Sequence, residues 1–71
     1  MNFCNNLQKL RKNKNISQEQ LAEELGVSRQ AVSKWESGAS YPEMDKLVLL
    51  CKIFNCNLDD LLNKDITQIE D

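Results

Sequence analysis

Apolar residues recur at helical spacing along most of the chain. Phe3, Leu7 and Leu10 follow one another at i, i+4 and i+7, which predicts an amphipathic helix over about residues 3–13. Four later groups with the same periodicity predict four more helices. Their apolar positions are Leu21, Ala22 and Leu25; Ala31, Val32 and Trp35; Met44, Leu47, Val48, Leu50, Cys51 and Phe54; and Leu58, Leu61 and Leu62. Because the chain has only two glycines and one proline, strands joined by tight hairpins are not expected. The pattern predicts an all-α fold of five helices.

Polar residues and glycines mark the ends of the second and third predicted helices. Ser17 and Gln20 form the pattern of a capping box at the start of the second helix. Gly26 stops that helix, because glycine adopts the left-handed backbone conformation that a helix end favours. Ser28 is the expected N-cap of the third helix, and Gly38 ends it.

The fourth and fifth predicted helices have similar signals. Pro42 suits the first turn of a helix, and Glu43 and Asp45 are favourable near its N-terminal dipole. Asn55 is the expected C-cap of the fourth helix, and Asn57 the N-cap of the fifth. These boundaries predict one domain over residues 1–63, followed by a short acidic tail over residues 64–71.

Charge is unevenly distributed, although the net charge is only −2. Residues 1–16 contain four basic side chains and no acid: Lys9, Arg11, Lys12 and Lys14. Residues 39–71 contain three lysines against seven acids. This polarity can orient the molecule on a phosphate backbone, but a solvated helix with scattered cations explains the basic segment equally well.

Composition excludes several classes of protein. The chain has no histidine, and its three cysteines contain no C-x-x-C pair, so neither a Cys/His zinc site nor a histidine-based catalytic site is expected. No glycine-rich phosphate loop is present, and Asp59 and Asp60 suit a helix N-terminus better than acid–base catalysis. We therefore expect no enzyme, metal, cofactor or small-molecule ligand. No apolar run approaches the ~20 residues of a membrane span and no leader is apparent, so we expect a cytoplasmic protein with its cysteines acting as small hydrophobic residues.

The segment from Gln18 to Ser37 has the requirements of a helix-turn-helix. It joins two short helices by a turn at Gly26 and places the small Ala22 where the helices cross. The stretch ISQEQLAEELGVSRQAVSKWESG resembles the helix-turn-helix of lambda-repressor-like, Cro-type regulators of bacteria and phages. The following YPEMDKLVLLCKIFNCNLDDLL is similar to the fourth and fifth helices of that family. The resemblance covers about residues 3–63 and implies a compact five-helix DNA-binding domain.

The outer face of the third predicted helix carries polar side chains without an acid. Its members are Arg29, Gln30, Ser33, Lys34 and Ser37. Arg and Lys suit guanine, and Gln suits adenine, in the major groove of DNA. The simpler alternative is that these side chains form the solvated side of an amphipathic helix.

The resemblance implies specific roles for these residues. Gln18, at the start of the second helix, resembles a phosphate-contacting position. Gln30 and Ser33 resemble the central base-reading positions, and Arg29 and Lys34 reach either bases or phosphates.

Four more residues complete the predicted site. Ser28 joins the DNA-binding set, and Ser37 resembles a backbone contact at which asparagine is common in the family. Arg11 and Glu36 match an ion pair between the first and third helices, and Arg11 has phosphate binding as its alternative role.

These features predict a sequence-specific, double-stranded DNA-binding transcriptional regulator, with a repressor favoured. One recognition helix reads few base pairs, so we expect a weak homodimer on a palindromic operator. Its expected interface comprises Phe54, Cys56, Leu58 and Leu62, helped by Ile66 and Ile69. The alternative function is a protein-interaction module that keeps the fold without binding DNA.

Overall fold

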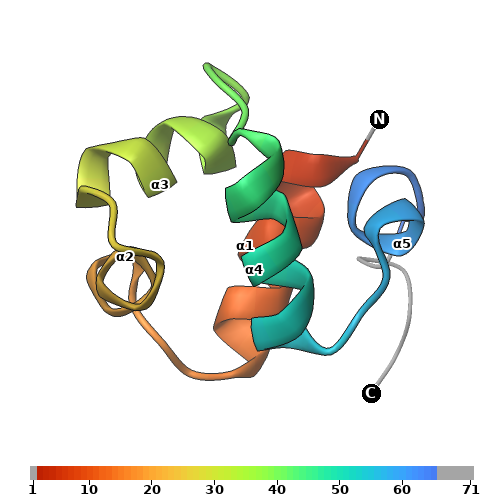
Figure 1. Ribbon diagram of the computed structural model, residues 1–71, viewed down its shortest axis with the longest axis horizontal. Helices are drawn as coiled ribbons and strands as arrows, with labels where there is room; N and C mark the ends of the chain where they lie inside the picture. Colours follow the sequence, from red (N-terminus) through yellow and green to blue (C-terminus); the bar gives the residue numbers. More distant parts are fainter. Residues whose placement is uncertain (1, 66–71) are drawn as a thin grey trace.

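The computed structural model describes residues 2–65, and this part of the chain contains five α-helices and no strand. The helices are α1 (Phe3–Asn13), α2 (Gln18–Leu25), α3 (Arg29–Ser37), α4 (Met44–Phe54) and α5 (Leu58–Leu62). In Figure 1, α2 and α3 lie on one side of the crossing pair α1 and α4, and α5 lies on the other. The predicted all-α, five-helix architecture is confirmed.

The expected caps form at both helices of the helix-turn-helix. The Ser17 hydroxyl accepts the Gln20 backbone N–H at 3.0 Å, and the Gln20 side chain accepts the Ser17 backbone N–H at 2.7 Å. Gly26 ends α2 in the left-handed conformation, with φ of 71°. The Ser28 hydroxyl then accepts the Ala31 backbone N–H at 3.2 Å and starts α3. Local side chains therefore set the boundaries of both helices.

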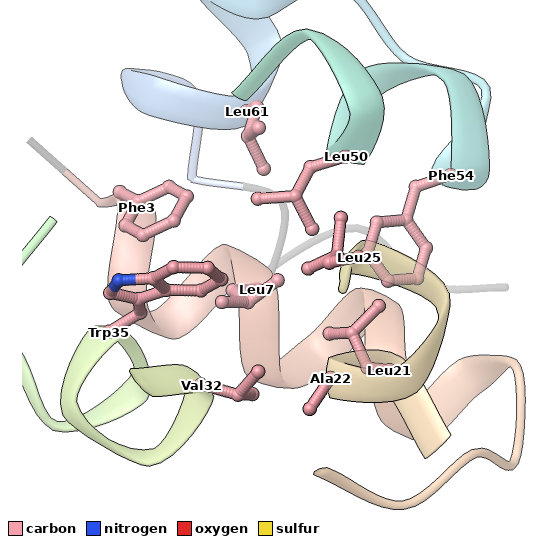
Figure 2. Packing of buried hydrophobic residues seen from close by; sticks show 10 residues of the cluster. All are labelled: Phe3, Leu7, Leu21, Ala22, Leu25, Val32, Trp35, Leu50, Phe54 and Leu61. Carbon is pink, nitrogen blue, oxygen red and sulfur yellow. The ribbon is translucent and has the colours of Figure 1, made fainter. Parts of the chain in front are cut away.

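One hydrophobic core joins all five helices, as Figure 2 shows. Its members are Phe3, Leu7, Leu21, Ala22, Leu25, Val32, Trp35, Leu50, Phe54 and Leu61. Full burial of a large apolar side chain contributes about 1.5–3 kcal/mol. Trp35 belongs to this core, so it holds α3 against α1 and does not serve as an exposed stacking surface.

Helix α4 differs from the prediction in its start and in its apolar face. It begins at Met44, with Glu43 as N-cap, so Pro42 precedes the helix and does not form its first turn. Met44 and Val48, which belong to its predicted apolar stripe, are 60% and 44% exposed. The reason is that α4 is covered on one side only, where it packs against α2 and α5.

A buried amide ties the two ends of the domain together. Asn6 is fully buried, and its Nδ2 donates to the backbone oxygen of Leu61 at 2.9 Å and of Asp60 at 3.2 Å. The backbone N–H of Asn2 donates to the Leu62 oxygen at 2.9 Å. These bonds fix α5 against α1 and place its end close to the predicted domain boundary at residue 63. Most of the predicted tail, with Ile66 and Ile69, lies outside the described residues.

One residue of the predicted dimer contact at the end of α4 is buried in the core of its own domain. Phe54 is only 9% exposed because its ring completes the core beneath α4. Cys56, Leu58 and Leu62 are half-buried, and Cys56 and Leu62 pack against the core. The large exposed hydrophobic residues lie elsewhere, on α4 and in the loop before it.

The two cysteines at the end of α4 lie in one turn. Asn55 has a left-handed backbone with φ of 53°, and the Cys56 backbone N–H donates to the Cys51 oxygen at 3.1 Å. This hydrogen-bond pattern brings the side chains of the two cysteines together. Burial raises the pKa of the Cys56 thiol from 9.0 to about 11, and neighbouring Cys51 and Asp60 add to the shift.

This shift predicts a loss of stability in alkali. Because the folded-state pKa is higher than the unfolded one, the folded chain holds more protons between pH 9 and 11, and the free energy of unfolding falls as the pH rises through that window. Urea titrations of the wild type and of Cys56→Ala from pH 8 to 11 should show a shallower fall in the variant. Cys4→Ala is the control for the removal of a half-buried thiol elsewhere in the fold. Parallel curves for the wild type and Cys56→Ala would contradict the assignment.

Candidate DNA-binding surface

The outward side of α3 carries three exposed polar or basic side chains. Arg29, Gln30 and Lys34 are exposed, and Ser33 between them is half-buried. Within residues 2–65, the side chains of Arg29, Gln30 and Lys34 make no hydrogen bond or ion pair. Their donors and acceptors are therefore available to an external ligand. Val32 and Trp35 fix this orientation because they anchor the opposite side of α3 in the core.

The two serines at the ends of α3 have local structural roles. Ser28 is exposed, and its hydroxyl oxygen accepts the Ala31 backbone N–H, so its proton stays available. The Ser37 hydroxyl donates its proton to the Lys34 backbone oxygen at 3.0 Å. The Ser37 hydroxyl therefore serves the last turn of α3, and its single proton is already used in this hydrogen bond.

Arg11 and Glu36 form a bidentate ion pair between α1 and α3. Arg11 Nε lies 2.7 Å from Glu36 Oε2, and Nη2 lies 3.1 Å from Oε1. The two side chains are only 13% and 5% exposed. Arg11 Nη1 also donates to the Ile16 backbone oxygen at 2.9 Å, which fixes the turn before α2. The pair thus holds α1, the start of α2 and α3 in one arrangement.

Two glutamines extend this ion pair into a network. Gln18 Nε2 donates to Glu36 Oε1 at 3.1 Å, and Gln8 Nε2 donates to the Glu36 backbone oxygen at 2.8 Å. Gln18 was predicted as a phosphate contact, and the structure places it in this network at the start of α2. The role of Gln8 was missed, although it precedes Arg11 and Lys12 by three and four residues and therefore shares their face of α1.

The network borders an open depression of about 370 Å³. It is lined by Gln8, Arg11, Lys12, Gln18, Ser33, Glu36 and Ser37. Four of the predicted DNA-binding residues therefore lie together here: Arg11, Gln18, Ser33 and Ser37. Lys12 was not predicted. Its charge remains uncompensated among the described residues because Glu36 is paired with Arg11.

The start of α2 adds backbone donors near this depression. The capping box uses the N–H groups of Ser17 and Gln20. In the described part of the chain, the N–H groups of Gln18 and Glu19 have no acceptor. Free N–H groups and the helix dipole favour an anion at a helix N-terminus.

Two other kinds of site were sought in residues 2–65. No cluster of three or more histidine, cysteine or acidic side chains has an arrangement that could hold a metal ion. None of the helices is long and apolar enough to cross a membrane.

Comparison with known sequences identifies relatives that share most of this chain. A family model described as helix-turn-helix matches residues 7–61. The HTH-type transcriptional activator BcrR of Enterococcus faecalis is 54% identical over 63 residues, which are 89% of this chain and 31% of BcrR. Repressor protein C2 of Salmonella phage P22 is 38% identical over 58 residues, or 82% of this chain and 27% of the repressor. The chain spans about a third of the length of these two relatives.

Solved structures agree with this relationship. The P22 c2 repressor in complex with a synthetic operator matches with a TM-score of 0.83 and 33% identity, over 89% of this chain and 96% of that one. A transcriptional regulator from Listeria innocua matches with a TM-score of 0.80 and 34% identity, over 83% of this chain and 55% of that one. The family model covers residues 7–61, which extend from α1 to α5. This chain therefore belongs to the helix-turn-helix family.

Proposed function

We propose that this chain binds double-stranded DNA sequence-specifically, by placing α3 in the major groove, and thereby regulates transcription. The observation that carries the proposal is the exposed, acid-free side of α3 beside a depression lined by Arg11 and Lys12. The related P22 c2 repressor was solved on a synthetic operator, which supports the same ligand here. Two relatives of this chain, BcrR and the P22 repressor C2, are named as a transcriptional activator and a repressor, and neither is named as an enzyme.

Gln30 and Ser33 are the proposed base-reading residues. Gln30 is exposed near the start of α3, where the residues of a recognition helix reach base edges. Its amide both donates and accepts, which matches N6 and N7 of adenine. Arg29 and Lys34 flank the two residues and reach guanine or the adjacent phosphates.

The depression between α1 and the start of α2 is the proposed phosphate contact. Lys12 supplies the charge, and the N–H groups of Gln18 and Glu19 supply directed donors. We propose that Arg11 has a positioning role and does not bind phosphate directly, because two of its N–H groups donate to Glu36. Through Glu36, Arg11 positions Gln18 and the end of α3. We include Ser28 and Ser37 as backbone contacts of lesser weight, because both hydroxyls already serve α3.

We propose a palindromic operator bound by a weak homodimer, with repression as the regulatory outcome. A bound dimer blocks RNA polymerase by steric exclusion and needs no further surface for this effect. The name of BcrR indicates activation in that relative, so a reporter assay on the selected operator decides the direction. Operators of bacteria and phages, the sources of these relatives, lie in the cytoplasm, which is where we place the protein.

Selection of bound duplexes from a random DNA pool tests this function. The expected result is an enriched palindrome with half-sites about one helical turn (~34 Å) apart. The affinity for that sequence should exceed the affinity for random DNA by about 10³-fold or more. A pool without enrichment would contradict the proposal and favour a protein-interaction module.

A further inference from the structure

Helix α4 presents a mixed apolar and charged stripe to solvent. Asp45, Val48, Leu49 and Lys52 are all exposed and form what we call the α4 face. At 3.6 residues per turn, these four positions lie within about 100° of the helix circumference. In Figure 1, α4 lies in front of α1, and no other described helix crosses in front of it.

The order of residues on the α4 face is self-complementary. Asp45 lies three residues before Val48, and Lys52 lies three residues after Leu49. The acid and the base are therefore equally far from the midpoint between the two apolar residues. A two-fold axis through that midpoint, perpendicular to α4, places α4 of a second copy antiparallel to α4 of the first. It brings Asp45 of each copy opposite Lys52 of the other and places the apolar pairs in contact. Such isologous matching is what a symmetric dimer requires.

We propose that a second copy of this chain docks on the α4 face, antiparallel, with two Asp45–Lys52 pairs flanking a Val48–Leu49 centre. The charges are available for this contact. Lys46 approaches Asp45 only loosely, at 3.8 Å, and the Asp45 side chain stays 70% exposed. Lys52 is exposed.

The α4 face also accounts for exposed apolar surface on this helix. Met44 is 60% exposed and borders the α4 face one turn before Val48. Burial of Val48 and Leu49 removes two of the four large hydrophobic residues that are exposed in the described part of the chain. The contact therefore explains why α4 is apolar on a side that its own domain leaves uncovered.

This inference deepens the proposed function because it identifies the surface that pairs two DNA-binding domains. It replaces the contact predicted at Phe54, Cys56, Leu58 and Leu62. The α4 face lies on a different helix from the outward side of α3, so the base-reading residues remain free. One helix per partner buries less than the ~800 Å² per side of a standard interface, so the dimer should be weak without DNA.

Charge reversal tests the α4 face without DNA. Sedimentation velocity over a concentration series measures the dimer dissociation constant of the whole chain. Asp45→Lys and Lys52→Asp should each raise it by about tenfold or more, because each reversal opposes like charges twice in the symmetric dimer. The double variant Asp45→Lys/Lys52→Asp restores opposite charges and should return the constant to within about threefold of the wild type. Lys64→Asp, an exposed reversal outside the α4 face, is the control and should leave the constant unchanged.

Several results would overturn the proposal. One is a wild type that stays monomeric at every concentration, and another is a double variant no better than the single ones. A third is a dimer that resists the α4 variants but dissociates in Leu58→Asp, which would place the contact at the start of α5. Circular dichroism checks that each variant is folded. Titration with a duplex that holds a single half-site separates DNA binding by α3 from dimerisation through the α4 face. The α4 variants should bind this duplex with the affinity of the wild type.

Discussion

Replacement of Arg11 by methionine is expected to lower the free energy of unfolding by about 3–5 kcal/mol. The Glu36 carboxylate is 5% exposed, and Arg11 provides two of its hydrogen bonds. Without the guanidinium, a nearly buried negative charge keeps only the amide of Gln18 as a side-chain partner. For a domain of this size, the loss corresponds to a fall in Tm of at least ~12 °C.

Thermal and urea unfolding followed by circular dichroism measure this effect. Lys12→Met is the matched control, because Lys12 is an exposed neighbour on the same helix, and its loss should change stability by less than about 0.5 kcal/mol. A double-mutant cycle with Glu36→Gln isolates the coupling between the two side chains. Equal effects of Arg11→Met and Lys12→Met, or a cycle without coupling, would show that the ion pair does not hold α1 to α3.

Gln30→Ala is expected to cost about 1–3 kcal/mol of binding free energy at one or two operator positions and little on random DNA. The reason is that a Gln amide discriminates between base edges, whereas phosphates are the same in every sequence. Gln18→Ala should instead weaken specific and random DNA by similar factors, because we propose that the start of α2 contacts phosphates, which carry no base identity. Fluorescence anisotropy on the selected operator, its single-base variants and a scrambled duplex separates the two patterns. If both variants weakened all duplexes alike, α3 would not be the reading helix.

Local sequence rules were sufficient for the five helices and for most of their ends, although not for the start of α4. The capping box at Ser17 and the left-handed Gly26 depend on residues within one turn, so the amino-acid pattern specifies them directly. The same holds for the N-caps Ser28 and Asn57. The outward side of α3 followed from periodicity, since Val32 and Trp35 mark the side that turns inward.

Burial on α4 could not be predicted in the same way. Hydrophobicity marks Met44, Val48 and Phe54 alike, yet Phe54 is buried while Met44 and Val48 are exposed. The difference depends on which sides of α4 are covered by α2 and α5, and that is a property of packing between distant segments. Phe54, a member of the predicted dimer contact, is buried for this reason.

Long-range polar contacts were only partly predictable. The Arg11–Glu36 pair was expected through the family resemblance, whereas the bond from Gln8 to the Glu36 backbone was not. Backbone oxygens carry no sequence signal, so a side chain that binds one across 28 residues leaves no pattern. Asn6 did leave a signal, because it lies three residues after Phe3 and beside Leu7, within the apolar side of α1.

An altered-specificity selection tests the central claim, that the outward side of α3 reads base edges, most directly. Duplexes selected from the same random pool by the wild type and by Gln30→Arg are sequenced and compared. At one position of each half-site, the preferred base should change from adenine to guanine, because a guanidinium pairs with O6 and N7 of guanine. The other positions should keep their preferences. Identical base preferences for the two proteins, with a clear palindrome selected by both, would contradict the claim. If Gln30 reads a base, its replacement by arginine must change the preferred base at that operator position.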